Sequence, residues 1–182
     1  MRTILAGALA LTTLASSAGA AVTILGGGQA AACFEAAKAG RSDDSSVTLC
    51  DVALENEVLA PPDRGGTFIN RGVMKMRRGQ YEAAHADFDA GIAMIPKTGE
   101  GWVNRGAMFV GEHRYKEGLD DIDRGIALGV AEPEKAYFNR GLAHEGLDDE
   151  KSAYLDYQQA ATLKPSWTAP QHELSRFTVT SR

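Results

Sequence analysis

The triplet Asn-Arg-Gly occurs three times in this chain, ending at Gly72, Gly106 and Gly141, and this repetition constrains the fold more than any other feature. The spacings between the glycines are 34 and 35 residues, and self-similarity at such a period is the signature of a repeat architecture. A glycine inside a helix costs about 1 kcal/mol relative to alanine. Its recurrence therefore indicates that a side chain has to be missing at this position of every unit.

Other positions recur in register with these glycines. An aromatic residue stands four positions before each glycine, small residues stand 12 and 19 positions after it, and a large apolar residue stands 16 positions after it. The apolar spacing within each half is helical, and polar stretches that contain Gly or Asp separate the halves. Each unit is thus predicted to be a helix–turn–helix, and the units must stack to bury their apolar faces. The expected close contacts between the two helices are Gly72 with Ala84, Gly106 with Gly118, and Gly141 with Ala153.

Residues 1–20 have the pattern of a secretory signal peptide: one Arg near the start, an uncharged Ala/Leu-rich run, and small residues at Ala18 and Ala20. We predict cleavage after Ala20. An uncleaved N-terminal anchor is the alternative, but the run is short and poor in strongly apolar residues for a membrane span. Because no second apolar segment follows, we expect no membrane insertion after cleavage and a periplasmic or secreted protein.

The charge of the chain bears on its partners. The whole chain has 19 basic and 24 acidic residues; the leader carries one of the basic ones, so 18 and 24 remain and the net charge is −6. Nucleic-acid-binding domains carry clustered Lys and Arg and are basic. The composition therefore predicts that nucleic acid is not a partner.

Cys33 and Cys50 are the only two cysteines, 17 residues apart, on either side of a polar turn at 39–46. An exported chain favours a disulfide between them. The bond would staple a helical hairpin and contribute about 3 kcal/mol in the chain-entropy model. A metal site would need more ligands at shorter spacing, so we expect no metal here.

The chain resembles tetratricopeptide repeat proteins. The stretches that carry the resemblance are "FINRG…GQYEAAHADFDAGIAMIP" (68–96), "WVNRG…HRYKEGLDDIDRGIALG" (102–129) and "YFNRG…EKSAYLDYQQAATLKP" (137–165). The resemblance implies an all-α, right-handed superhelical solenoid of antiparallel helix pairs. The predicted divisions are a signal peptide (1–20), a disulfide-stapled helical hairpin (21–64), three repeats (65–98, 99–133 and 134–167) and a C-terminal capping helix with a tail (168–182). We expect Pro61 and Pro62 to break the chain before the first repeat.

Each Arg of the triplets is followed 16 residues later by an Asp. The recurrence predicts a ladder of ion pairs within or between repeats, because Arg stems pack along helices with the guanidinium paired at the edge. Contact of the arginines with a ligand is the alternative. The pairs are Arg71 with Asp87, Arg105 with Asp121, and Arg140 with Asp156.

The resemblance places Asn70, Asn104 and Asn139 on the first helices of the repeats, facing a concave groove. In related repeats that hold the C-terminal carboxylate of a peptide, such asparagines act beside Lys or Arg. Lys135 and Arg77 are the candidate cations here. Glu100, at the matching position of the second repeat, would repel a carboxylate and argues for another kind of ligand.

Apolar residues are expected to line the rest of this groove, where Met and aliphatic side chains suit an adaptable peptide site. The alternative is that neighbouring helices cover several of them. The expected lining residues are Ile69, Val73, Met76, Val103, Val110, Phe138 and Leu142.

No pattern in the chain indicates catalysis. The four histidines fall at different places in their repeats and do not form a metal motif, and no Gly-rich phosphate loop follows a strand. We expect no enzyme activity and no cofactor. The predicted function is a non-catalytic protein–protein interaction module that binds a partner protein or peptide segment in the concave groove, in the bacterial envelope. The alternative is a self-associating scaffold for envelope assembly that uses its convex or end faces. The partner, the form of its bound segment and the oligomeric state stay open at this point.

Overall fold

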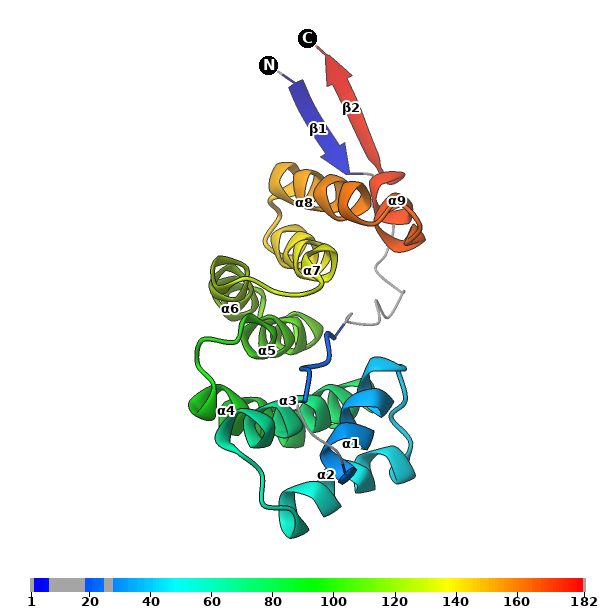
Figure 1. Cartoon of the computed structure of the whole chain (residues 1–182). Helices are drawn as coiled ribbons and strands as arrows, with labels where there is room; N and C mark the ends of the chain where they lie inside the picture. Colours follow the sequence, from blue (N-terminus) through cyan, green and yellow to red (C-terminus); the bar gives the residue numbers. More distant parts are fainter. Residues whose placement is uncertain (1, 7–18, 25–27, 182) are drawn as a thin grey trace.

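The computed structural model describes residues 2–6, 19–24 and 28–181 of the chain, with nine α-helices and two short strands among them (Figure 1). The first hairpin consists of α1 (Gly28–Lys38) and α2 (Asp44–Asn56). Three further helix pairs follow, and one short helix ends the helical part. These elements are α3 (Pro61–Arg77) with α4 (Tyr81–Met94), α5 (Gly99–Gly111) with α6 (Tyr115–Leu128), α7 (Pro133–Gly146) with α8 (Glu150–Leu163), and α9 (Thr168–Leu174).

The helix pairs form one continuous stack, from α1 and α2 at one end to α8 and α9 at the other (Figure 1). Consecutive pairs pack on each other through α4 and α5 and through α6 and α7, while both helices of the first hairpin pack on α3. The predicted class is confirmed: the body of the protein is an all-α solenoid of helix pairs. Burial of each pair against its neighbours provides the core that a single hairpin would lack.

Helix α3 begins at Pro61, so the two prolines start a helix where the sequence predicted only a break. Proline is well placed in the first turn, because the backbone N–H that it lacks would have no partner within the helix and its φ is already helical. The first helix of this repeat is consequently longer than its equivalents, with 17 residues in α3 against 13 in α5 and 14 in α7.

The two strands were not expected from the sequence. Strand β1 (Arg2–Ala6) pairs antiparallel with β2 (Phe177–Ser181), with Arg2 opposite Ser181 and Ala6 opposite Phe177. The strands project from the α8–α9 end of the stack, and both ends of the chain lie there (Figure 1). Residues 2–6 belong to the predicted leader, and residues 177–181 to the predicted tail. Long-range backbone pairing of this kind carries no local sequence signal.

The repeated glycines allow close packing in two different ways. A Cβ atom on Gly106 would lie 2.7 Å from the carbonyl oxygen of Gly118, so the two helix backbones meet there, as predicted. At Gly72 and Gly141 the Cβ would instead lie 2.7 Å from an aromatic ring, that of Phe88 or Tyr157. The predicted contact of two small residues is therefore right for the second repeat, whereas in the first and third repeats the glycine makes room for the ring on the opposite helix.

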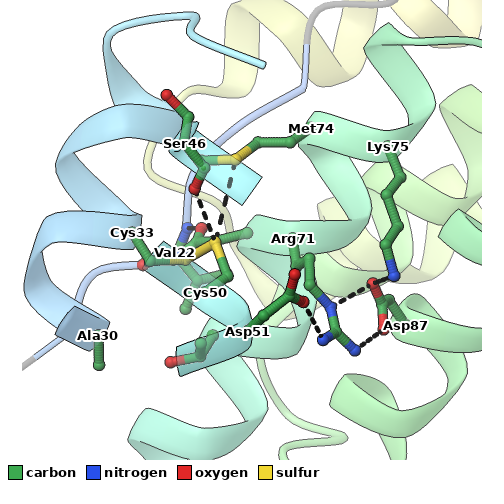
Figure 2. Close-up of a disulfide and its surroundings, with 12 residues drawn as sticks. Val22, Ala30, Cys33, Ser46, Cys50, Asp51, Arg71, Met74, Lys75 and Asp87 are labelled. Carbon is green, nitrogen blue, oxygen red and sulfur yellow. Dashed lines mark hydrogen bonds and ion pairs between the residues drawn. A yellow bond between two sulfur atoms is a disulfide. The ribbon is translucent and has the colours of Figure 1, made fainter. Parts of the chain in front are cut away.

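The predicted disulfide is confirmed. Cys33 of α1 and Cys50 of α2 are bonded, with their Cα atoms 4.9 Å apart (Figure 2). Both are fully buried, in a cluster that includes Met74 of α3. Asp43 caps α2 by accepting a hydrogen bond from the backbone N–H of Ser46 at 3.0 Å. The stapled hairpin is therefore part of the solenoid core, packed on the first repeat.

Candidate functional site

Two of the three asparagines hold a segment of the chain itself. The backbone N–H of Ala20 donates to Oδ1 of Asn104 at 2.9 Å, and Nδ2 of Asn104 donates to the Ala20 carbonyl at 2.7 Å. In the same way, Val22 donates to Oδ1 of Asn70 at 2.7 Å and accepts from its Nδ2 at 2.8 Å. A carboxamide has an acceptor and a donor side by side. Each Asn therefore pairs with both polar backbone groups of one residue, irrespective of the side chain that this residue carries.

The three asparagines are buried side chains of the first helices in the folded chain. Asn70 on α3 and Asn104 on α5 are completely buried, and Asn139, at the equivalent place on α7, is buried too. Leaving a buried polar group without a hydrogen bond costs about 1–3 kcal/mol. The backbone of the groove segment supplies the hydrogen-bond partners of Asn70 and Asn104 in this buried position.

The segment Gly19–Ile24, named here the groove segment, has the alternation of an extended chain. Ala20, Val22 and Ile24 are buried, whereas Thr23 is exposed and Ala21 is half-buried. Period-two burial is what successive side chains on opposite sides of an extended backbone produce. In Figure 1 the segment passes along α5 and then α3, in the direction that its hydrogen bonds define.

The apolar side chains of the groove segment enter the protein core. Val22 belongs to a buried cluster with Val73 and Met76 of α3. A Cβ atom on Gly66 would lie 2.9 Å from Ile24 and 3.0 Å from Val22, so the absence of a side chain at Gly66 leaves the space that these two residues fill. Val73 and Met76, both predicted to line the groove, therefore contact its occupant.

Both predicted cations reach the start of the groove segment. Arg77 of α3 and Lys135 of α7 donate to the Gly19 carbonyl oxygen, each at 3.4 Å. Lys135 also forms an ion pair with Glu132 at 2.8 Å, and Arg77 donates to the Ala37 carbonyl at 2.8 Å. Burial lowers the pKa of the Arg77 guanidinium, and the charge of Glu132 acts in the opposite direction. The structure thus brings Asn70, Asn104, Arg77 and Lys135 to one stretch of backbone.

Glu100, which was expected to repel a carboxylate in the groove, forms a hydrogen bond outside it. Its Oε1 accepts a hydrogen bond from the backbone N–H of Ala131 at 2.9 Å. Glu100 therefore ties α5 to the loop between α6 and α7.

Five of the apolar residues expected along the groove pack between helices instead. Ile69 lies against Gly91 and Gly101, Val103 against Gly125, and Val110 against Gly118. The Phe138 ring packs at a tilt against the rings of Tyr157 and Trp167, with ring centroids 5.6 and 4.9 Å from its own. Leu142 packs beside the clusters of the second and third repeats. The first helix of each repeat is apolar on several sides, so helical periodicity alone does not separate groove positions from interior ones.

Comparison with known proteins bears on the fold. No protein-family model matches the sequence, and a search of curated proteins finds no significant match. Solved structures are similar, however. The Arabidopsis OM64 TPR domain superposes with a TM-score of 0.60 at 20% identity, covering 64% of this chain and 96% of that domain. The second TPR domain of human RPAP3, in complex with the HSP70 peptide SGPTIEEVD, gives 0.57 at 26% identity, with 64% and 96% covered. MamA gives 0.60 at 17% identity, with 78% and 80% covered.

The chain has the tetratricopeptide repeat fold. The three copies of the sequence pattern lie on α3–α4, α5–α6 and α7–α8, which are called the tetratricopeptide repeat (TPR) units below. The hairpin α1–α2 precedes them, and the groove segment crosses the first helices of the repeats.

The arginine beside each Asn of the TPR units serves the scaffold. In all three repeats Nε and Nη2 of the Arg donate to the buried Asp 16 residues later, at 2.6–3.0 Å. Nη1 reaches back to an acid on the preceding helix pair, at 2.6–2.8 Å. The ladder predicted from the sequence is confirmed, and it acts both within and between repeats (Figure 2 shows its first step). The reached-back acids are Asp51, Asp89 and Asp123.

Across residues 2–6, 19–24 and 28–181, no three His, Cys, Asp or Glu side chains are grouped as a metal site would require. In the same ranges, every helix is too short or too polar to span a bilayer.

The groove segment itself is the part of the site that sequence reasoning missed. The prediction divides it between the leader and the N-terminal hairpin and gives the Asn column no partner within the chain. One signal was available: Val22, Thr23 and Ile24 are three consecutive β-branched residues, which favour an extended backbone, next to a chain that is helical elsewhere. Gly65 and Gly66, in the first turns of α3, were a second sign of a close approach.

Proposed function

We propose that this protein is a non-catalytic interaction module that binds an extended segment of a partner protein along Asn70 and Asn104. The observation that carries the proposal is the pairing of each amide with both backbone groups of one residue in the groove segment. Such pairing does not depend on side chains, so the backbone of another protein can form the same bonds. Two of the similar structures hold peptides: the second TPR domain of RPAP3 with an HSP70 peptide, and the first TPR of Spaghetti with an HSP90 peptide.

The chemistry of the groove supports binding over catalysis. Its polar side chains are carboxamides, a guanidinium and an ammonium group that already contacts Glu132. A catalytic site would require a nucleophile or an acid–base pair within hydrogen-bond reach of a reacting atom. Amides and cations instead recognise peptide backbone and carbonyl or carboxylate oxygens.

The proposal includes export to the bacterial envelope, with Ala21 as the first residue of the processed chain. The leader pattern and the Cys33–Cys50 bond support it. Cleavage after Ala20 would take Ala20 away from Asn104 and leave Val22 on Asn70. N-terminal sequencing of the protein recovered from the envelope fraction should begin at Ala21; a chain that still begins at Met1 would contradict this part of the proposal.

The binding role is tested with a library of displayed random peptides. The protein as cells produce it is compared with an Asn70→Ala/Asn104→Ala variant whose folding is verified by circular dichroism. Loss of four backbone hydrogen bonds should weaken the selected peptides at least tenfold, since each bond contributes about 0.5–1.5 kcal/mol. Asp89→Asn, on another side of the same stack, is the matched control and should bind as the parent does. Peptides that bind the parent and the Asn variant equally would place the interaction elsewhere, and self-association measured by sedimentation would then favour a scaffold.

A further inference from the structure

We propose that the groove segment is a built-in ligand, and that it competes with partner segments for the Asn column. The inference rests on the proposed function and adds a ligand class: an extended segment with small or aliphatic residues at every second position. In the chain before cleavage, Gly19–Ile24 is the example of that class that the chain carries itself. Cleavage after Ala20 would remove Gly19 and Ala20 and leave Ala21–Ile24, held by the two bonds between Val22 and Asn70.

The mode of attachment is that of a ligand in a groove. All four backbone bonds of Ala20 and Val22 go to side chains of α3 and α5, which are 48 and 84 residues away in sequence. A strand of a sheet would instead pair with the backbone of a neighbouring strand. Side-chain amides on fixed helices keep their geometry when one backbone replaces another, so the groove can exchange its occupant.

The tether makes this occupant a strong competitor. Only residues 25–27 separate Ile24 from the start of α1 at Gly28. A short linker holds its ligand at an effective concentration in the millimolar range. A partner segment with an affinity similar to that of the groove segment therefore cannot displace it at micromolar concentrations.

The contacts of the groove segment define which ligands fit. A Cβ atom on Gly19 would lie 2.9 Å from Val73, so a side chain at this position requires Val73 to move. Ala20 is buried at the next position, whereas the space over Gly66 takes the larger Val22 and Ile24. The exposed Thr23 leaves its position unselective. The preferred ligand thus carries its smallest residues beside Asn104 and Arg77, and aliphatic residues beyond Asn70.

The test displaces the groove segment in the chain before cleavage, which retains Gly19 and Ala20 and is called the unmodified chain below. Ala20→Pro/Val22→Pro removes the two N–H groups that donate to Asn104 and Asn70. Ala21→Pro is the matched control, because the Ala21 N–H donates no hydrogen bond within the described part of the chain. The probe is the peptide Gly-Ala-Ala-Val-Thr-Ile, acetylated, amidated and labelled for fluorescence anisotropy. The double variant should bind this probe at least tenfold more tightly than the unmodified chain or the control. Adding Asn104→Ala to the double variant should weaken binding about tenfold.

Two results would overturn the proposal: equal binding of the probe by the unmodified chain and the double variant, or no binding by a folded double variant. If the double variant does not fold, hydrogen exchange in the unmodified chain tests the competition directly. Excess peptide selected from the library should speed exchange of the Ala20 and Val22 amides at least tenfold while the amides of α5 stay protected. Unchanged protection of Ala20 and Val22 in the presence of bound peptide would equally overturn it.

The outcomes separate this inference from the proposed function. Library peptides that bind the unmodified chain and the double-proline variant with equal affinity leave the interaction role intact and refute competition. A library that yields no binder, with the labelled peptide still bound by the double variant, refutes the partner role and shows that the groove serves the chain's own segment.

Discussion

Adjacent residues on one helix have opposite tasks in this protein. Asn104 pairs with the backbone of the groove segment, whereas Arg105, the next residue, pairs with Asp121 of its own repeat and Asp89 of the preceding one. Successive helix residues point about 100° apart, so the triplet presents one polar group to the groove and the other to the stack. The partners of the Arg are held on rigid helices, whereas the partner of the Asn is a tethered segment. The same repeat therefore combines a scaffold contact with a recognition contact.

The largest expected effect is on the scaffold side. Arg105→Ala removes the bidentate partner of Asp121 and leaves a nearly buried carboxylate without its cation. Breaking one side of such a pair typically costs 3–5 kcal/mol when it is fully buried. Because the Arg105 side chain is 19% exposed, we expect a loss of about 2–3 kcal/mol in the free energy of unfolding, measured by urea denaturation. Stability equal to that of the parent would show that Arg105 does not stabilise the stack of helices.

A smaller loss is expected on the groove side. In the chain before cleavage, Asn104→Ala leaves the N–H and carbonyl of Ala20 without their partner, which should cost about 1–2 kcal/mol in the same denaturation experiment. In the Ala20→Pro/Val22→Pro background, where the segment is displaced, the same substitution should change stability by less than about 0.5 kcal/mol. An equal cost in both backgrounds would show that Asn104 stabilises the helices and not the bound segment.

The ion pair of Arg105 with Asp89 of the preceding repeat should contribute less to stability than its pair with Asp121 of the same repeat. Asp89→Asn keeps the size of the side chain and removes the charge facing Arg105, at a site where the Asp89 side chain is 46% exposed. Exposed ion pairs contribute about 0–1 kcal/mol, so we expect a loss of about 0.5 kcal/mol by urea denaturation. A loss of stability comparable with that of Arg105→Ala would mean that most of the stabilisation comes from the pair with Asp89, between repeats, and not from the pair with Asp121, within one repeat.

Salt should change the stability cost of Arg105→Ala by a few tenths of a kcal/mol and leave that of Asn104→Ala unchanged. In 1 M NaCl the Debye length falls to about 3 Å, which screens the partly exposed charges of the Arg ladder but not the neutral amides of the Asn column. The cost of Arg105→Ala should therefore shrink relative to low salt, while the cost of Asn104→Ala stays constant. An equal effect of salt on both variants would show that Arg105 and Asn104 do not differ in the way that an ion pair and a neutral hydrogen bond do.

The parts predicted correctly from the sequence are those that recur or pair within a short stretch of chain. The period of the glycines gave the stacked helix pairs, the interval of 16 residues gave the Arg–Asp ladder, and the only two cysteines gave the bond in the first hairpin. Each depends on contacts within one repeat or between neighbouring ones, where helical periodicity places side chains reliably.

What lies in the groove was decided by the tertiary structure. The bonds from Ala20 to Asn104 and from Val22 to Asn70 join residues 84 and 48 positions apart. The pattern of a six-residue stretch is too short to predict which distant residues it contacts. Likewise, Val103 and Val110 carry the same helical spacing as true groove residues, yet they pack against Gly125 and Gly118 of the second helix. The repeats could be predicted from the residue pattern, because their contacts are local and periodic. Only the packed stack determined the occupant of the groove, because that choice depends on which distant backbone completes the buried amides.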